Sequence, residues 1–115
     1  MSRDKQLVYR IIACLKESNT FINQSGYTKS KQLSENSMVL RACTMCIIEV
    51  SELVYEMSDL NRSKIKIFRD LTLKKIRNRA AHSYGSINKE MLAALILSIS
   101  SNKTIQKIEE LAKEI

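Results

Sequence analysis

Apolar residues recur at three- and four-residue steps along most of the chain, the spacing that places side chains on one face of a helix. The first helix is expected over roughly residues 4–23, and a polar stretch with Gly26 ends it. The second is expected over roughly residues 35–58, and its stripe is the longest, which favours a position at the centre of the fold. The two stripes consist of Leu7, Ile11, Cys14, Leu15 and Ile22, and of Val39, Ala42, Cys46, Val50, Leu53 and Met57.

Three more helices are predicted in the second half of the chain. A connection through residues 59–63, in which Ser63 can serve as a cap, leads into a third helix over roughly residues 64–82. Gly85 is suited to ending it, because glycine tolerates a left-handed backbone. Asn88 can cap the fourth helix, and Ser101 or Asn102 can begin the fifth. Their core-facing residues are Phe68, Leu71, Thr72, Ile76 and Ala80 in the third, Met91, Leu92, Leu95, Ile96 and Ile99 in the fourth, and Ile105, Ile108, Leu111 or Ala112, and Ile115 in the fifth.

Length and composition agree with a helical domain. The chain has 115 residues, two glycines, no proline and 44% hydrophobic residues, so strand and turn signals are few and one core suffices. Short connections between helices favour antiparallel neighbours. We therefore expect an all-α protein with a single domain over residues 1–115, an antiparallel up-down four-helix bundle with an additional C-terminal helix.

The three cysteines, Cys14, Cys43 and Cys46, are an odd number and lie within apolar stripes. We expect buried hydrophobic thiols in a reducing compartment. A zinc site at Cys43 and Cys46 lacks a full ligand set, and no glycine-rich phosphate loop is present, so no metal and no cofactor are expected. The longest apolar run, residues 91–97, is too short to span a bilayer and the N-terminus lacks a signal-peptide core. These features predict a cytoplasmic protein without a membrane partner.

Positive charge is concentrated in one segment of the chain. The formal net charge is +7, and the segment from Arg62 to Arg79 contains eight bases and one acid, so the other bases and acids cancel. Such a segment attracts polyanions, and Lys74, Lys75 and Arg79 are candidate RNA-binding residues. A solvated helix face that keeps the protein soluble is an alternative reading of the same charge.

The octet RNRAAHSY, residues 77–84, contains the only histidine of the chain. An imidazole exchanges protons near neutral pH, and a general acid or base of this kind contributes roughly 10²- to 10⁴-fold to a rate. A guanidinium stays charged and binds phosphate and the charge that builds on phosphorus. Arg77 and His82 therefore fit cleavage of an RNA phosphodiester, with the ribose 2′-hydroxyl as nucleophile and no metal.

On a regular helix Arg77 and His82 would point about 140° apart, because five residues rotate by about 500°. They can meet if the helix end unwinds or if the helices of two chains cross, so the octet predicts a cluster at a helix end or at a dimer seam. Structural roles also remain open. His82 can bind helix-end carbonyls, Arg77 and Arg79 can be solvated, and Tyr84 can be a packed aromatic with its hydroxyl in water.

At these residues the chain resembles the HEPN superfamily, and within it the HepT-like toxins of toxin–antitoxin pairs. HEPN ribonucleases share an arginine, then four to six residues of which the first is polar, then a histidine. Arg77, Asn78 and His82 match this pattern. The HepT-like branch extends it to R-x-x-x-x-H-x-Y, which Tyr84 completes, and a continuation similar to the family's follows as YGSIN.

The resemblance covers nearly the whole chain and includes Ser51-Glu52, which looks like the Gly-Glu pair frequent in the family. Three positions depart from the pattern. Ser51 and Ser86 stand where glycines are frequent, and Asn88 stands for an acid. These departures bear on the subfamily more than on the catalytic assignment.

The resemblance implies a homodimeric, metal-independent endoribonuclease in which the motif helices of two chains face each other and form a composite site. In this reading Arg77 binds the phosphate, His82 is the acid or base, Asn78 orients the site, and Tyr84 contacts it. The substrate is RNA, either tRNA or mRNA. The family also implies a minimal nucleotidyltransferase antitoxin that binds the toxin and can transfer AMP to the motif tyrosine, here Tyr84.

Two other functions remain open at this point. Many HEPN-type bundles resemble adaptors beside nucleotidyltransferases, and in such a non-catalytic binding module the octet would hold the dimer or the partner. A basic nucleic-acid-binding bundle is a further alternative, and it predicts a steeply salt-dependent affinity that is independent of His82.

Overall fold

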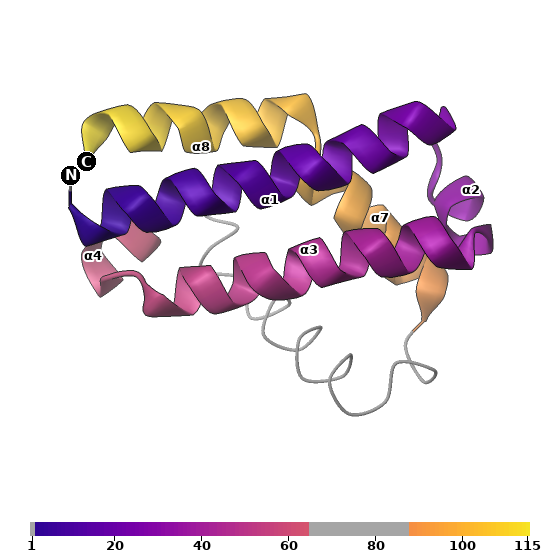
Figure 1. Ribbon diagram of the computed structural model, residues 1–115, viewed down its shortest axis with the longest axis horizontal. Helices are drawn as coiled ribbons and strands as arrows, with labels where there is room; N and C mark the ends of the chain where they lie inside the picture. Colours follow the sequence, from indigo (N-terminus) through magenta and orange to yellow (C-terminus); the bar gives the residue numbers. More distant parts are fainter. Residues whose placement is uncertain (1, 65–87) are drawn as a thin grey trace.

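The computed structural model describes residues 2–64 and 88–115, and every regular element in these two ranges is an α-helix (Figure 1). The expectation of an all-α protein is confirmed for them. The predicted third helix, roughly residues 64–82, and its expected end at Gly85 lie outside the described residues except for Lys64. The helices are α1 (Arg3–Ser25), α2 (Ser30–Glu35), α3 (Ser37–Glu56), α4 (Asp59–Arg62), α7 (Lys89–Ile99) and α8 (Asn102–Glu114).

Helix α1 begins and ends where its sequence provides caps. The Ser2 side chain accepts a hydrogen bond from the Lys5 N–H at 3.2 Å. At the other end Gly26 adopts φ 72°, and its N–H donates to the Asn23 carbonyl. This left-handed conformation is cheap only for glycine, so the predicted stop is confirmed. All five residues predicted for the first stripe are buried.

The second predicted helix is α3, and a short helix that was not predicted, α2, precedes it. Gln32 Oε1 accepts hydrogen bonds from the backbone N–H groups of Thr28 and Lys29, which starts the separate short helix α2, and Leu33 of α2 is fully buried. Asn36 then has an extended backbone, and its side chain accepts from Val39 N, so α3 begins only at Ser37. The expected helix over roughly residues 35–58 is confirmed to within two residues at each end, and these side-chain bonds to the backbone explain why it begins only at Ser37.

Helix α4 was predicted only as a connection. Ser58 caps it, and Asp4 of α1 accepts hydrogen bonds from Ser58 N and, at 2.7 Å, from Asn61 Nδ2. Ser63 lies at the C-terminal end of this helix. A contact between residues more than fifty positions apart therefore holds the turn.

The last two helices begin at their predicted caps. Asn88 accepts from Met91 N at 3.1 Å, and Ser101 accepts from Thr104 N at 3.2 Å. In α8 both Leu111 and Ala112 are buried. Met91 was expected in the core but is 71% exposed, because the buried face of α7 is formed by Leu92, Ala93, Ile96 and Ile99 instead.

Helix α1 lies between α3 and α8 and runs antiparallel to both, while α7 crosses behind α1 and α3 (Figure 1). An ion pair agrees with the antiparallel direction of α1 and α3, since Arg3 at the start of α1 pairs with Glu56 at the end of α3 at 3.4 Å. A second ion pair, between Lys16 of α1 and Glu109 of α8 at 3.7 Å, links these two helices. The core is formed mainly by α1, α3, α7 and α8. The up-down order of a four-helix bundle stays a prediction, because one of its helices is not among the described residues.

Candidate functional site

The residues that the sequence singles out for chemistry lie between positions 65 and 87 and therefore outside the described residues. The structure describes the residues that flank this segment on either side, up to residue 64 and from residue 88. Arg62, the first base of the basic segment, closes α4 and pairs with Asp59. Asn88, at the other end, caps α7. The predicted residues that lie outside are Lys74, Lys75, Arg77, Asn78, Arg79, His82 and Tyr84.

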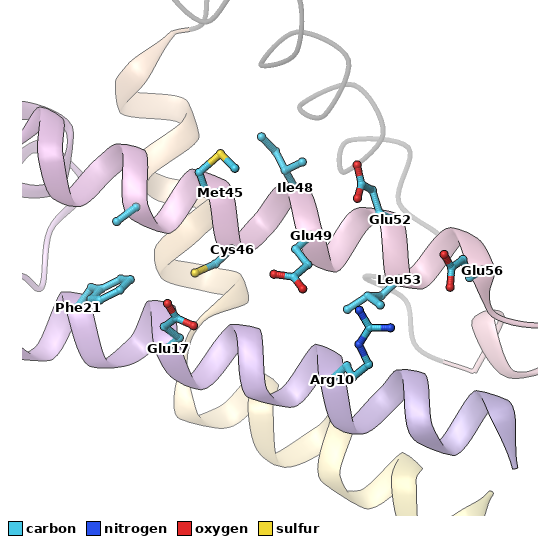
Figure 2. Close-up of a pocket in the computed structure, with 11 residues that line it drawn as sticks. Arg10, Glu17, Phe21, Met45, Cys46, Ile48, Glu49, Glu52, Leu53 and Glu56 are labelled. Atoms are coloured by element: carbon cyan, nitrogen blue, oxygen red, sulfur yellow. The ribbon is translucent and has the colours of Figure 1, made fainter. Parts of the chain in front are cut away.

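In the described part, an open cavity of about 580 Å³ forms a groove between α1 and α3 (Figure 2). We call it the α1/α3 groove. Its apolar part comes from both helices, and Met45 on its edge is 64% exposed. The lining residues are Arg10, Glu17 and Phe21 from α1, and Ala42, Met45, Cys46, Ile48, Glu49, Glu52, Leu53 and Glu56 from α3.

The α1/α3 groove is acidic although the protein as a whole is basic. Four glutamates and one arginine line it, which is a local formal charge of −3 in a chain of +7. Figure 2 shows Glu17 of α1 and Glu49 of α3 directed into the space between the two helices, with Arg10 further along. Glu56 lies further along α3, and Glu52 projects from the side of α3 that faces away from α1 in this view.

Only part of this negative charge is matched by positive charge among the described residues. Glu56 pairs with Arg3 at 3.4 Å, and both side chains are largely exposed. Glu17, Glu49 and Glu52 form no ion pair in the described ranges. The groove therefore has a charge that favours cations over phosphates.

The three cysteines are free and buried, as the sequence predicted. Burial raises the pKa of the Cys14 thiol to about 12, and the adjoining Glu49 adds to this rise. Burial and the charge of Glu17 raise the pKa of Cys46 to about 11, and burial also raises the pKa of Cys43. At neutral pH these thiols are protonated and belong to the apolar part of the structure.

Residues 2–64 and 88–115 contain no group of three or more histidine, cysteine or acidic side chains arranged to hold a metal ion. The same ranges contain no helix that is both long enough and apolar enough to cross a bilayer. A second, polar hollow of about 430 Å³ lies where α2 meets α3. There Asn36 Nδ2 donates to the Tyr27 hydroxyl at 2.8 Å, so these polar groups satisfy one another.

The α1/α3 groove could not be predicted from the sequence. Glu49 and Glu52 are recognisable as charges on one helix, but their partner across the groove, Glu17, is thirty residues away in sequence. The available signal was in α1, where Arg10, Glu17 and Phe21 are spaced by seven and four residues and so share one helix face. Which helix that face meets depends on the tertiary fold.

Comparison with protein-family models, with curated proteins and with solved structures yields no match to this chain.

Proposed function

We propose that this protein is a metal-independent endoribonuclease of the HEPN type and the toxin of a toxin–antitoxin pair. The observation that carries the proposal is the sequence Arg77-Asn78-x-x-x-His82-x-Tyr84, embedded in a segment with eight bases and one acid. The all-α structure of the described residues is compatible with it. The proposed fold is an antiparallel four-helix bundle with an additional C-terminal helix.

The proposed reaction is transesterification within the RNA. A base removes the proton of a ribose 2′-hydroxyl, the 2′-oxygen forms a bond to the adjacent phosphorus, and the bond from phosphorus to the 5′-oxygen breaks. An acid donates a proton to that leaving oxygen. The products are a 2′,3′-cyclic phosphate and a 5′-hydroxyl, and no metal or water enters this step.

In this mechanism His82 transfers the protons, and Arg77 stabilises the charge on phosphorus because its guanidinium remains protonated. Asn78 orients the site, and Tyr84 contacts the substrate. In the proposed homodimer each of the two sites combines Arg77 of one chain with His82 of the other, and His82 takes the proton of the 2′-hydroxyl and then donates it to the leaving oxygen. Lys74, Lys75 and Arg79 bind the RNA backbone through charge.

We further propose that a minimal nucleotidyltransferase is the antitoxin. The phenolic oxygen of Tyr84 would attack the α-phosphorus of ATP, with pyrophosphate as the leaving group, and would leave AMP on the tyrosine. The added phosphodiester carries a negative charge, which would repel the RNA backbone from the site.

The proposal is tested by incubating the purified protein with tRNA and with mRNA in the presence of EDTA. We expect cleavage by the wild-type protein, and a fall of at least about 10²-fold in rate for His82→Ala and for Arg77→Ala. Lys107→Ala is a matched control, because Lys107 is an exposed base on α8, outside the basic segment. It should cleave at the wild-type rate.

The alternative functions are outcomes of the same experiment. RNA binding that survives both substitutions, with no cleavage by the wild-type protein, would show a non-catalytic module. Cleavage that is abolished by EDTA would contradict a metal-independent mechanism. Mass spectrometry of the cut ends adds a second test, since hydrolysis by water would yield no 2′,3′-cyclic phosphate.

A further inference from the structure

Apolar side chains bordered by several glutamates are unusual on a protein whose formal net charge is +7. The α1/α3 groove has this composition, and its acidic side chains come from two helices that the fold brings together (Figure 2). Its α3 side extends from Ala42 to Glu56, which is about 21 Å of helix at 1.5 Å per residue. A helix of about fourteen residues would match that length.

The composition of the groove decides what chemistry it can bind. Phe21 and Ile48 are partly exposed and contribute apolar surface, and the exposed Met45 adds a flexible thioether of the kind that adapts to apolar partners. The carboxylates of Glu17, Glu49 and Glu52 line this groove and form no ion pair with a described residue. Nucleic acid is therefore repelled here, whereas lysine and arginine side chains are attracted.

We propose that the α1/α3 groove is a docking surface for a basic amphipathic helix presented by a partner protein. The apolar face of that helix packs on Phe21, Met45 and Ile48, and its lysines or arginines reach the glutamates of the groove. Helix-in-groove recognition of this kind combines apolar anchors with charges at the border. The inference stands on the described residues and is independent of the ribonuclease proposal.

The test uses the full-length protein and fluorescently labelled helical peptides of about fourteen residues. One peptide has a leucine stripe flanked by lysines, a second carries glutamates in place of the lysines, and a third keeps the lysines but has alanines in place of the leucines. Fluorescence anisotropy should show saturable binding of the first peptide alone. Its affinity should fall with added salt, because the border charges are exposed.

Two double variants identify the binding surface. Glu49→Lys with Glu52→Lys reverses two exposed charges of the groove, and we expect at least a tenfold weaker affinity for the leucine–lysine peptide. Glu110→Lys with Glu114→Lys makes the same change of net charge on exposed positions of α8 and should leave the affinity within about twofold. Circular dichroism confirms that both variants keep the helical fold.

Three results would overturn the proposal. Equal losses in the two double variants would mean that only the overall charge matters. Binding of the glutamate peptide or the alanine peptide as tight as that of the leucine–lysine peptide would mean that the groove does not recognise a basic amphipathic helix. If light scattering shows a dimer that dissociates in the Glu49→Lys, Glu52→Lys variant alone, the occupant is a second copy of this chain.

Discussion

The hydroxyl oxygens of Ser18 and Ser100 lie 2.8 Å apart, and both side chains are almost completely buried. Ser18 is in the middle of α1, and Ser100 is the residue that ends α7, so this bond fixes the turn between α7 and α8 on the central helix. Asn19 strengthens the same junction by donating to the Ser100 carbonyl at 2.8 Å.

Removing one hydroxyl of this pair should destabilise the protein more than its size suggests. Ser100→Ala leaves the buried Ser18 hydroxyl without its partner, at a cost of about 1–3 kcal/mol in the free energy of unfolding. The double variant Ser18→Ala, Ser100→Ala should lose less than the sum of the two single variants, because neither partner is left unsatisfied. Urea denaturation measures both, and Ser98→Ala, at an exposed position on α7, is the control. Additive losses would contradict the account of this bond.

The left-handed conformation of Gly26 predicts a backbone effect. Gly26→Ala should cost roughly 1–2 kcal/mol, because φ 72° is unfavourable for a residue with a Cβ atom. No neighbouring atom lies within 4 Å of the added carbon, so the cost is conformational and not steric. Gly26→Asn should recover part of the loss, since asparagine tolerates this region better. Equal stability of the glycine and alanine proteins in thermal unfolding would refute this.

Asp4 should make the protein less stable in acid. Hydrogen bonds from the side chains of Ser58 and Asn61 lower the pKa of Asp4 in the folded protein. A carboxyl whose folded pKa is lowered contributes stability above its unfolded pKa, near 3.9, and loses it as the pH falls through the folded value. Asp4→Asn should therefore lose about 1 kcal/mol or less at pH 7 and show a flatter dependence below pH 4. Urea denaturation at several pH values measures the free energy of unfolding of both proteins. If this free energy changes with pH equally in the two proteins, Asp4 does not have the assigned role.

The raised pKa values of the cysteine thiols predict that a thiol reagent modifies them slowly in the folded protein. At pH 7.5 Cys14 and Cys46, with pKa values of about 12 and about 11, are almost entirely protonated, and the thiolate is the reactive form. A thiol reagent should modify the folded protein at least about 10²-fold more slowly than the urea-unfolded chain, in which all three cysteines are accessible. Rapid modification of the native protein would show that these thiols are exposed or ionised.

The helices of the described part could largely be predicted from sequence, because apolar spacing and capping residues are local signals. Gly26, Asn88 and Ser101 act at the helix ends where the pattern placed them. Helices α2 and α4 could not be foreseen. Helix α2 depends on the Gln32 side chain, which accepts hydrogen bonds from the backbone. Helix α4 depends on Asp4, which lies in the first turn of α1, distant in sequence, and accepts a hydrogen bond from Ser58 N.

The two candidate sites differ in what the sequence could reveal. The proposed ribonuclease motif is a local pattern around Arg77 and His82, which can be recognised without a structure. The α1/α3 groove is a product of packing, since Glu17 and Glu49 become neighbours only when α1 and α3 lie antiparallel.

The central claim is that Arg77 of one chain and His82 of another build one RNA-cleaving site. It is tested most directly by combining the Arg77→Ala and His82→Ala chains, each inactive alone, by co-expression with different tags, and by assaying the isolated mixed dimer on RNA in EDTA. One of its two sites would hold both intact residues, so we predict about half of the wild-type activity. A mixed dimer no more active than either variant, beside an active wild-type protein, would show that each site lies within one chain and would contradict the claim.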